Sequence, residues 1–166
     1  MSKLEIALQQ IKDARRYTCR LLDQVDPSDW FRQPMEGVTH VAWQVAHVAV
    51  AQYWLALNRV RGKRPGDDEI IPEFYLKRFG RESVPDPNPS RNPSAQEIRS
   101  VFDRVHEKVL SEIPTYAEAE LEAPVSRPQP MYSTRIGALL FCPQHEMAHA
   151  GQIGLLRRLH GKPTLW

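Results

Sequence analysis

The chain has 166 residues, of which 42% are hydrophobic and 25% are charged, and its formal net charge is +2. This length suits one domain with its own hydrophobic core, so we expect a single domain over residues 1–166. So small a net charge gives no reason to expect a nucleic-acid partner or binding to an anionic membrane surface.

The first half of the chain predicts two amphipathic helices from the 3.6-residue spacing of its apolar side chains. The first helix spans about residues 3–25 and ends before Pro27, because proline cannot continue a helix. The second spans about residues 39–61, with Thr39 as its N-terminal cap. Its apolar residues cover much of its circumference, which predicts a central position in the fold.

The second half of the chain predicts two more helices. The third helix opens with Ser94 and Glu97, which match the S-x-x-E capping box, and it ends before Pro114. The fourth spans about residues 133–160, and Gly161 follows it as a natural C-terminal cap. No segment alternates apolar and polar residues for long enough to predict a strand.

Four helices of this length predict an all-α fold, an antiparallel four-helix bundle. The connection between the second and third helices, residues 62–93, is long and rich in proline. We expect this proline-rich crossover to be either a lid over a functional site or a solvated connection. The most apolar segment, residues 41–57, is interrupted by glutamine and histidine, so no membrane span is expected.

Two further signals bear on the location of the protein. Cys19 and Cys142 are the only cysteines, too few for a disulfide framework, and a reducing compartment is the usual setting for such a chain. The first residues lack the apolar core of a secretory signal. We therefore expect a cytoplasmic protein.

The most informative chemical signal is the run H-E-M-A-H-A-G-Q at residues 145–152. His145 and His149 are four residues apart, which places both imidazole rings on one helix face, close enough to share a metal ion. Apolar neighbours imply that this helix is largely buried, and a metal ion would remove the cost of burying unpaired ring nitrogens. The alternative is that both are ordinary core or surface histidines.

A third candidate ligand is His47, in the second predicted helix. A lone histidine on an apolar face is usually a core residue, but bundle interiors build metal sites from facing helices. Three neutral imidazoles would leave a coordination position open. His40 would lie about 10 Å from His47 along the helix, so we expect it at a pocket mouth or exposed. Cys142 is better interpreted as a small buried hydrophobe than as a ligand.

The first five letters of the run also match H-E-x-x-H, in which Glu146 would be the general base of a zinc protease. Such proteases need a third ligand, usually downstream, but no acidic residue follows His149. The absence of a predicted strand for aligning a peptide also disfavours a peptidase. Glu146 stays a candidate base for a metal-bound water, and an ion pair is its alternative role.

Two motifs of this chain resemble the DinB-like (YfiT-like) superfamily of metal-binding four-helix bundles. They are the segment 42–47, which ends in His47, and the H-x-x-x-H-x-G-Q motif at residues 145–152. The order and spacing of these two pieces match the family, as does the spread of helices over nearly the whole chain. The resemblance implies that His47, His145 and His149 form a metal triad. It also implies zinc or nickel as the metal, and a homodimer.

The resemblance implies more than one reaction, because some members use low-molecular-weight thiols in transfer or isomerisation and others are called hydrolases. We expect a metal-dependent thiol transferase that acts on small electrophiles. The alternatives are a hydrolase that uses metal-bound hydroxide, and a non-catalytic, metal-stabilised binding or stress-response protein. The expected partners are thus a small-molecule substrate and a thiol.

Side chains around the candidate ligands add two expectations. Thiol cofactors often carry carboxylates, so a transferase predicts basic residues at the pocket mouth, for which Arg78, Arg81 and Arg135 are candidates. Gln44 and Gln152 lie about one turn from the histidines, and we expect them to bond the ring nitrogens that face away from the metal.

Overall fold

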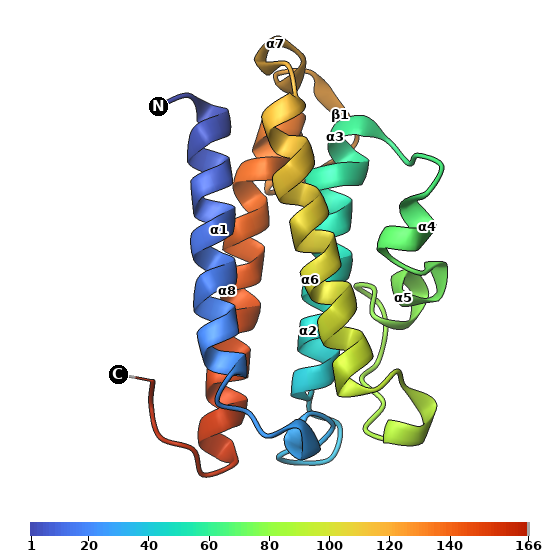
Figure 1. The fold of residues 1–166 in the computed structure, drawn as a ribbon, viewed down its shortest axis with the longest axis vertical. Helices are drawn as coiled ribbons and strands as arrows, with labels where there is room; N and C mark the ends of the chain where they lie inside the picture. The colour runs from blue at the N-terminus through green and yellow to red at the C-terminus, as the bar shows by residue number, and fades with distance from the viewer. Residues whose placement is uncertain (166) are drawn as a thin grey trace.

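The computed structural model describes residues 1–165 and is mostly helical (Figure 1). Its long helices are α1 (Lys3–Leu22), α2 (Val41–Gln52), α6 (Ala95–Glu112) and α8 (Arg135–Leu159). They lie side by side, with α1 against α8, α8 against α2, and α2 against α6. The all-α prediction is confirmed in this broad form. Within the described residues, no helix is long and apolar enough to cross a bilayer.

The shorter elements occupy the connections between the long helices. They are η1 (Pro27–Asp29), η2 (Tyr53–Asn58), α3 (Arg59–Arg61), α4 (Asp67–Ile70), α5 (Glu73–Arg78), η3 (Pro89–Arg91), η4 (Ile113–Thr115), α7 (Glu118–Leu121), β1 (Pro124–Gln129) and β2 (Tyr132–Thr134). The strands β1 and β2 form an antiparallel pair, so the expectation of no strand is wrong. The pairing is short and irregular, and strand β1 contains two prolines, which leaves no alternating pattern in the sequence.

Helix ends follow the local signals closely. The capping box of Ser94 and Glu97 opens α6, and Ser2 forms a second capping box at the start of α1. Helix α2 is capped by His40 rather than Thr39, because the Nδ1 atom of His40 accepts a hydrogen bond from the Trp43 amide at 3.2 Å. His40 is only 1% exposed, which contradicts the expectation that it lies at a pocket mouth or in solvent.

The second predicted helix is built from three consecutive segments. Helix α2 passes into the π-helix η2 and then into α3, which together reach Arg61. Ten of the twelve residues of α2 are buried, as its all-round apolar surface predicts. A π-helix carries more residues per turn than an α-helix, so the side chains beyond Gln52 face directions that an unbroken α-helix would not give them.

A buried arginine connects all of the long helices. The Arg15 guanidinium of α1 donates to both carboxylate oxygens of Glu146 on α8, at 2.8 and 3.3 Å. It also donates to the side-chain oxygen of Gln52 on α2 at 2.9 Å and to the backbone oxygen of Phe102 on α6 at 2.7 Å. The guanidinium carbon lies 3.4 Å from the centre of the Phe102 ring. One buried guanidinium thus connects α1, α2, α6 and α8.

The segment 62–93 packs along one face of α2. The ring of His40 bonds the backbone oxygen of Asp86 at 3.0 Å, and the Trp43 indole N–H donates to the Ser83 hydroxyl at 3.0 Å. One turn further on, the Nδ1 atom of His47 bonds the backbone oxygen of Phe79 at 2.7 Å. These contacts hold the segment in place over the start of α2, so it is not a solvated connection there.

Candidate metal centre

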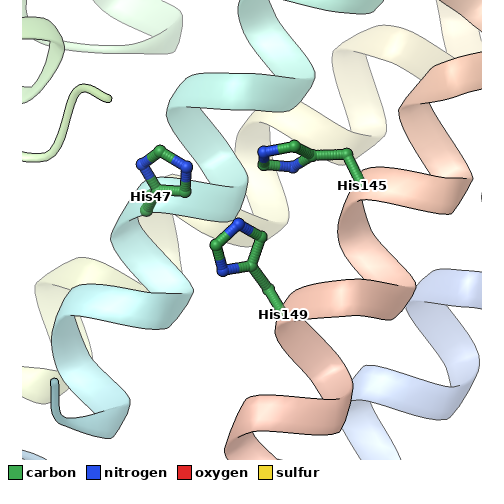
Figure 2. A group of neighbouring side chains, drawn as sticks. All are labelled: His47, His145 and His149. Carbon is green, nitrogen blue, oxygen red and sulfur yellow. The ribbon is translucent and has the colours of Figure 1, made fainter. Parts of the chain in front are cut away.

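Three histidines converge between α2 and α8 (Figure 2). His47 comes from α2, and His145 and His149 come from successive turns of α8. One ring nitrogen from each can be chosen so that all three lie within 4.8 Å of one another, which makes this a group that could hold a metal ion. The ring centres are 4.5 Å apart for His145 and His149, 4.7 Å for His47 and His149, and 5.3 Å for His47 and His145.

Hydrogen bonds fix which nitrogen faces the centre on two of the rings. A carbonyl oxygen can only accept, so the Nδ1–H of His47 donates to the backbone oxygen of Phe79. The Nδ1–H of His149 donates to the side-chain oxygen of Gln44 at 2.5 Å. In both rings this leaves the lone pair on Nε2, which is the form that binds a metal.

Burial keeps the three rings neutral. Desolvation lowers the pKa of His47, whose side chain is buried. Desolvation, with a smaller contribution from His47, lowers the pKa of His145 to about 4. Desolvation, with smaller contributions from His145 and His47, lowers the pKa of His149 to about 3. Near pH 7 each ring therefore has a free lone pair, which is the donor set that zinc, nickel and other borderline ions accept.

Gln44 is itself held in place by other side chains. Its amide nitrogen donates to the side-chain oxygen of Gln152 at 2.8 Å and to the Thr39 hydroxyl at 2.9 Å. The amide oxygen is thereby turned toward His149. The prediction that a glutamine bonds a histidine ring is confirmed for Gln44. It is wrong for Gln152, which bonds the Gln44 amide instead and so orients it. Thr39, which does not cap α2, belongs to this chain of hydrogen bonds.

Aromatic rings lie against two of the histidines. The indole of Trp43 stacks on His47 at 4.6 Å between ring centres, with an angle of 9° between the planes. The ring of Phe141, one turn before His145, meets that histidine edge-on at 6.1 Å. These contacts restrict the rotation of both imidazoles and give the surroundings of the site an apolar character.

Glu146 does not face the histidines with a free carboxylate. Its side chain is 3% exposed, and both oxygens accept hydrogen bonds from Arg15. The structure therefore favours the ion-pair role over that of a general base. Cys142 is buried, and burial raises the pKa of its thiol, in agreement with the interpretation as a small core residue.

Two of the three predicted arginines, Arg78 and Arg81, lie in segment 62–93 on either side of Phe79, and the third begins α8. Arg78 donates to the side chain of Asn92 and lies 3.6 Å from a carboxylate oxygen of Asp86. Arg81 is exposed in segment 62–93. Arg135 begins α8, ten residues before His145, which corresponds to about 15 Å along the helix. Arg135 is therefore too far away to lie at the mouth of a pocket centred on the histidines.

We expect the substitution Gln44→Leu to weaken metal binding about 10- to 100-fold without unfolding the chain, because the ring of His149 loses the acceptor that orients it. Competition with a chromophoric chelator measures the affinity. Gln144→Leu is the matched control, since Gln144 is exposed on α8 and its amide bonds the Leu140 carbonyl. Equal affinities for the two variants would contradict this role for Gln44.

These features define a class: a helical protein in which two facing helices bring three neutral histidines together around a position that could hold a divalent ion. The family model of the DinB superfamily matches residues 10–153, and the chain belongs to that superfamily. The resemblance seen in its two histidine motifs is thereby confirmed.

A solved structure agrees with this assignment at the level of the fold. The crystal structure of a conserved protein from Enterococcus faecalis superposes with a TM-score of 0.72 and 16% sequence identity. The match covers 98% of this chain and 99% of that one. No curated protein matches the sequence. The comparisons therefore establish the family and the fold, and they name no reaction.

Proposed function

We propose that the protein holds a divalent metal ion on His47, His145 and His149, and that it transfers a low-molecular-weight thiol to small electrophiles. The proposal rests on the convergence of three neutral imidazoles with no carboxylate in the group. A divalent ion bound by neutral ligands keeps its charge available, and it lowers the pKa of a thiol that binds beside it. Zinc and nickel are the proposed metals because imidazole suits both.

The surrounding residues support this chemistry by holding the histidines. Phe79, through its backbone oxygen, and Gln44 keep two rings in the tautomer that points Nε2 at the centre. Trp43 and Phe141 supply apolar surface against which an electrophile can rest. As the frame, we propose an antiparallel four-helix bundle in which residues 62–93 form the crossover.

Metal analysis is the first test of the proposal. The protein purified without a metal-affinity tag is expected to retain about one zinc or nickel ion per chain after dialysis, because three histidines converge on one position. Elemental analysis measures this ratio. A wild-type protein that binds neither ion stoichiometrically would refute the proposed function.

The second test is a reaction assay on the metal-loaded protein. Chlorodinitrobenzene serves as the electrophile, with glutathione, cysteine and coenzyme A as the thiols, and the thioether product is followed by absorbance. We expect one thiol to give a rate that depends on the metal and is lost after chelation. A metal-dependent hydrolysis of nitrophenyl acetate in place of thiol transfer would favour the hydrolase alternative. A bound metal with neither activity would favour a metal-stabilised binding protein.

The homodimer and the cytoplasmic location stay predictions. Light scattering of the purified protein tests the first, and fractionation of the cells that produce it tests the second. Neither is needed for the chemistry proposed above, because one copy of the chain supplies all three histidines.

A further inference from the structure

A cavity of about 650 Å³ lies at the other end of the molecule from the C-terminal end of α8. Its walls come from the end of the π-helix and α3, from residues 115–121, from strand β1, and from the first residue of α8. In Figure 1 these elements, α3, α7 and β1, gather at the top of the view. Arg135 in its wall is about 15 Å along α8 from His145, so the cavity is separate from the histidine centre.

The wall of this cavity is rich in positive charge. Four arginines line it, Arg59, Arg61, Arg64 and Arg135, against one acidic side chain, Glu120. Its volume falls within the range of small-molecule sites in proteins. Such a concentration of guanidinium groups around a hollow is suited to anions, because each presents a planar fork of N–H donors.

Arg61 lines the cavity, but its side chain is already paired with protein groups and is not free to bind a ligand. Its side chain is 4% exposed and forms ion pairs with Asp67 at 2.8 Å and with Glu112 at 2.5 Å. All three of its nitrogens donate, to the two carboxylates and to the backbone oxygen of Gly62. Lys108 also pairs with Glu112 at 3.1 Å. The two acidic residues are thereby balanced by Arg61 and Lys108.

The other three arginines carry charge in excess of this network. Arg64 reaches Glu112 only at 3.6 Å, and its side chain is 56% exposed. The Nε atom of Arg59 is buried and has no hydrogen-bond partner among residues 1–165. Arg135 forms no ion pair with a described side chain and is half-buried. These three guanidinium groups therefore add positive charge to the wall of the cavity beyond what the Arg61 network balances, and such charge attracts an anion.

We propose that this cavity is a second binding site, for a small molecule that carries a phosphate or carboxylate group. Arg59 and Arg135 bind the anionic group, and the exposed Arg64 side chain contacts it from the solvent side. Arg61, held by its ion pairs, fixes the position of the cavity wall. Glu120 opposes the ligand's charge and limits its affinity. The site is independent of the histidine centre, so it stands whether or not the proposed thiol chemistry does.

Calorimetric titration of the full chain at low ionic strength tests the proposal. The probes are inorganic phosphate and citrate, with sodium chloride as the ionic-strength control. We expect saturable binding of at least one probe, and the two arms show whether the site takes phosphate or carboxylate. Arg59→Gln and Arg135→Gln should each weaken binding at least about tenfold, because each removes a charge-assisted hydrogen bond. Glu120→Gln should strengthen binding.

Arg127→Gln is the matched control, because Arg127 is exposed on the same strand β1 but does not line the cavity. The Arg127→Gln variant should bind the probe with the same affinity as the wild type. Circular dichroism and the midpoint of thermal unfolding verify that each variant is folded. Two results would overturn the proposal: no saturable binding of either probe up to about 10 mM, or an equal loss of binding in Arg127→Gln and in the two cavity variants.

Discussion

Replacing His149 with alanine is expected to abolish stoichiometric metal binding, from about one ion per chain to near zero after dialysis. The three ring centres form a nearly equilateral triangle, with His149 4.5 Å from His145 and 4.7 Å from His47, and 5.3 Å between His145 and His47. The loss of His149 leaves only two nitrogen donors, fewer than the three that a zinc site of this kind uses. His47→Ala and His145→Ala should have the same effect, and elemental analysis after dialysis measures it.

His160→Ala is the matched control for these variants. His160 ends the same helix α8, eleven residues beyond His149, and belongs to no group of candidate ligands within residues 1–165. It should retain the full metal content. If His149→Ala keeps about one ion per chain, the metal is bound elsewhere and the proposed centre is wrong.

The second large effect is on stability, because Arg15→Met should lower the free energy of unfolding by about 3–5 kcal/mol. The substitution leaves the Glu146 carboxylate buried, at 3% exposure, without the cation that pairs with it. It also removes the donors to Gln52 and to the Phe102 backbone. Equilibrium unfolding in urea, followed by circular dichroism, measures the difference.

Two companion variants separate the buried charge from the loss of packing. Arg15→Met combined with Glu146→Leu should recover a large part of the lost stability, because the uncompensated charge is gone. Arg16→Met removes the exposed pair with Asp13 and should change stability by less than about 1 kcal/mol. A double variant as unstable as Arg15→Met alone would show that the buried charge is not the cause.

The helices were predictable because their signals are local. The apolar spacing and the prolines located the four long helical segments, with ends within a few residues of those observed. The capping box of Ser94 and Glu97 is confirmed at the start of α6 for the same reason, since both partners lie within one turn. The α8 helix passes through Pro143, because the proline interrupts one hydrogen bond while the packing of the helix continues on both sides.

Other elements carried no such signal. The hairpin of β1 and β2 pairs few residues, and its register shift between Pro124 and Gln129 removes the alternation that would mark a strand. The π-helix η2 has an ordinary apolar sequence, Y-W-L-A-L-N, that is equally compatible with an α-helix. His40 looked like an exposed residue, but its backbone position makes it the cap of α2 and its ring bonds the distant Asp86.

The sequence by itself determined the family, the mainly helical fold and the candidate ligands, because a 3.6-residue period and a four-residue histidine spacing are properties of a single helix. Only the tertiary structure decided what surrounds those ligands. The Phe79 carbonyl that fixes the ring of His47 is a backbone atom 32 residues away, and no side-chain pattern encodes it. Arg15 lies 131 residues from Glu146, and this distant pairing moved Glu146 from candidate base to structural ion pair.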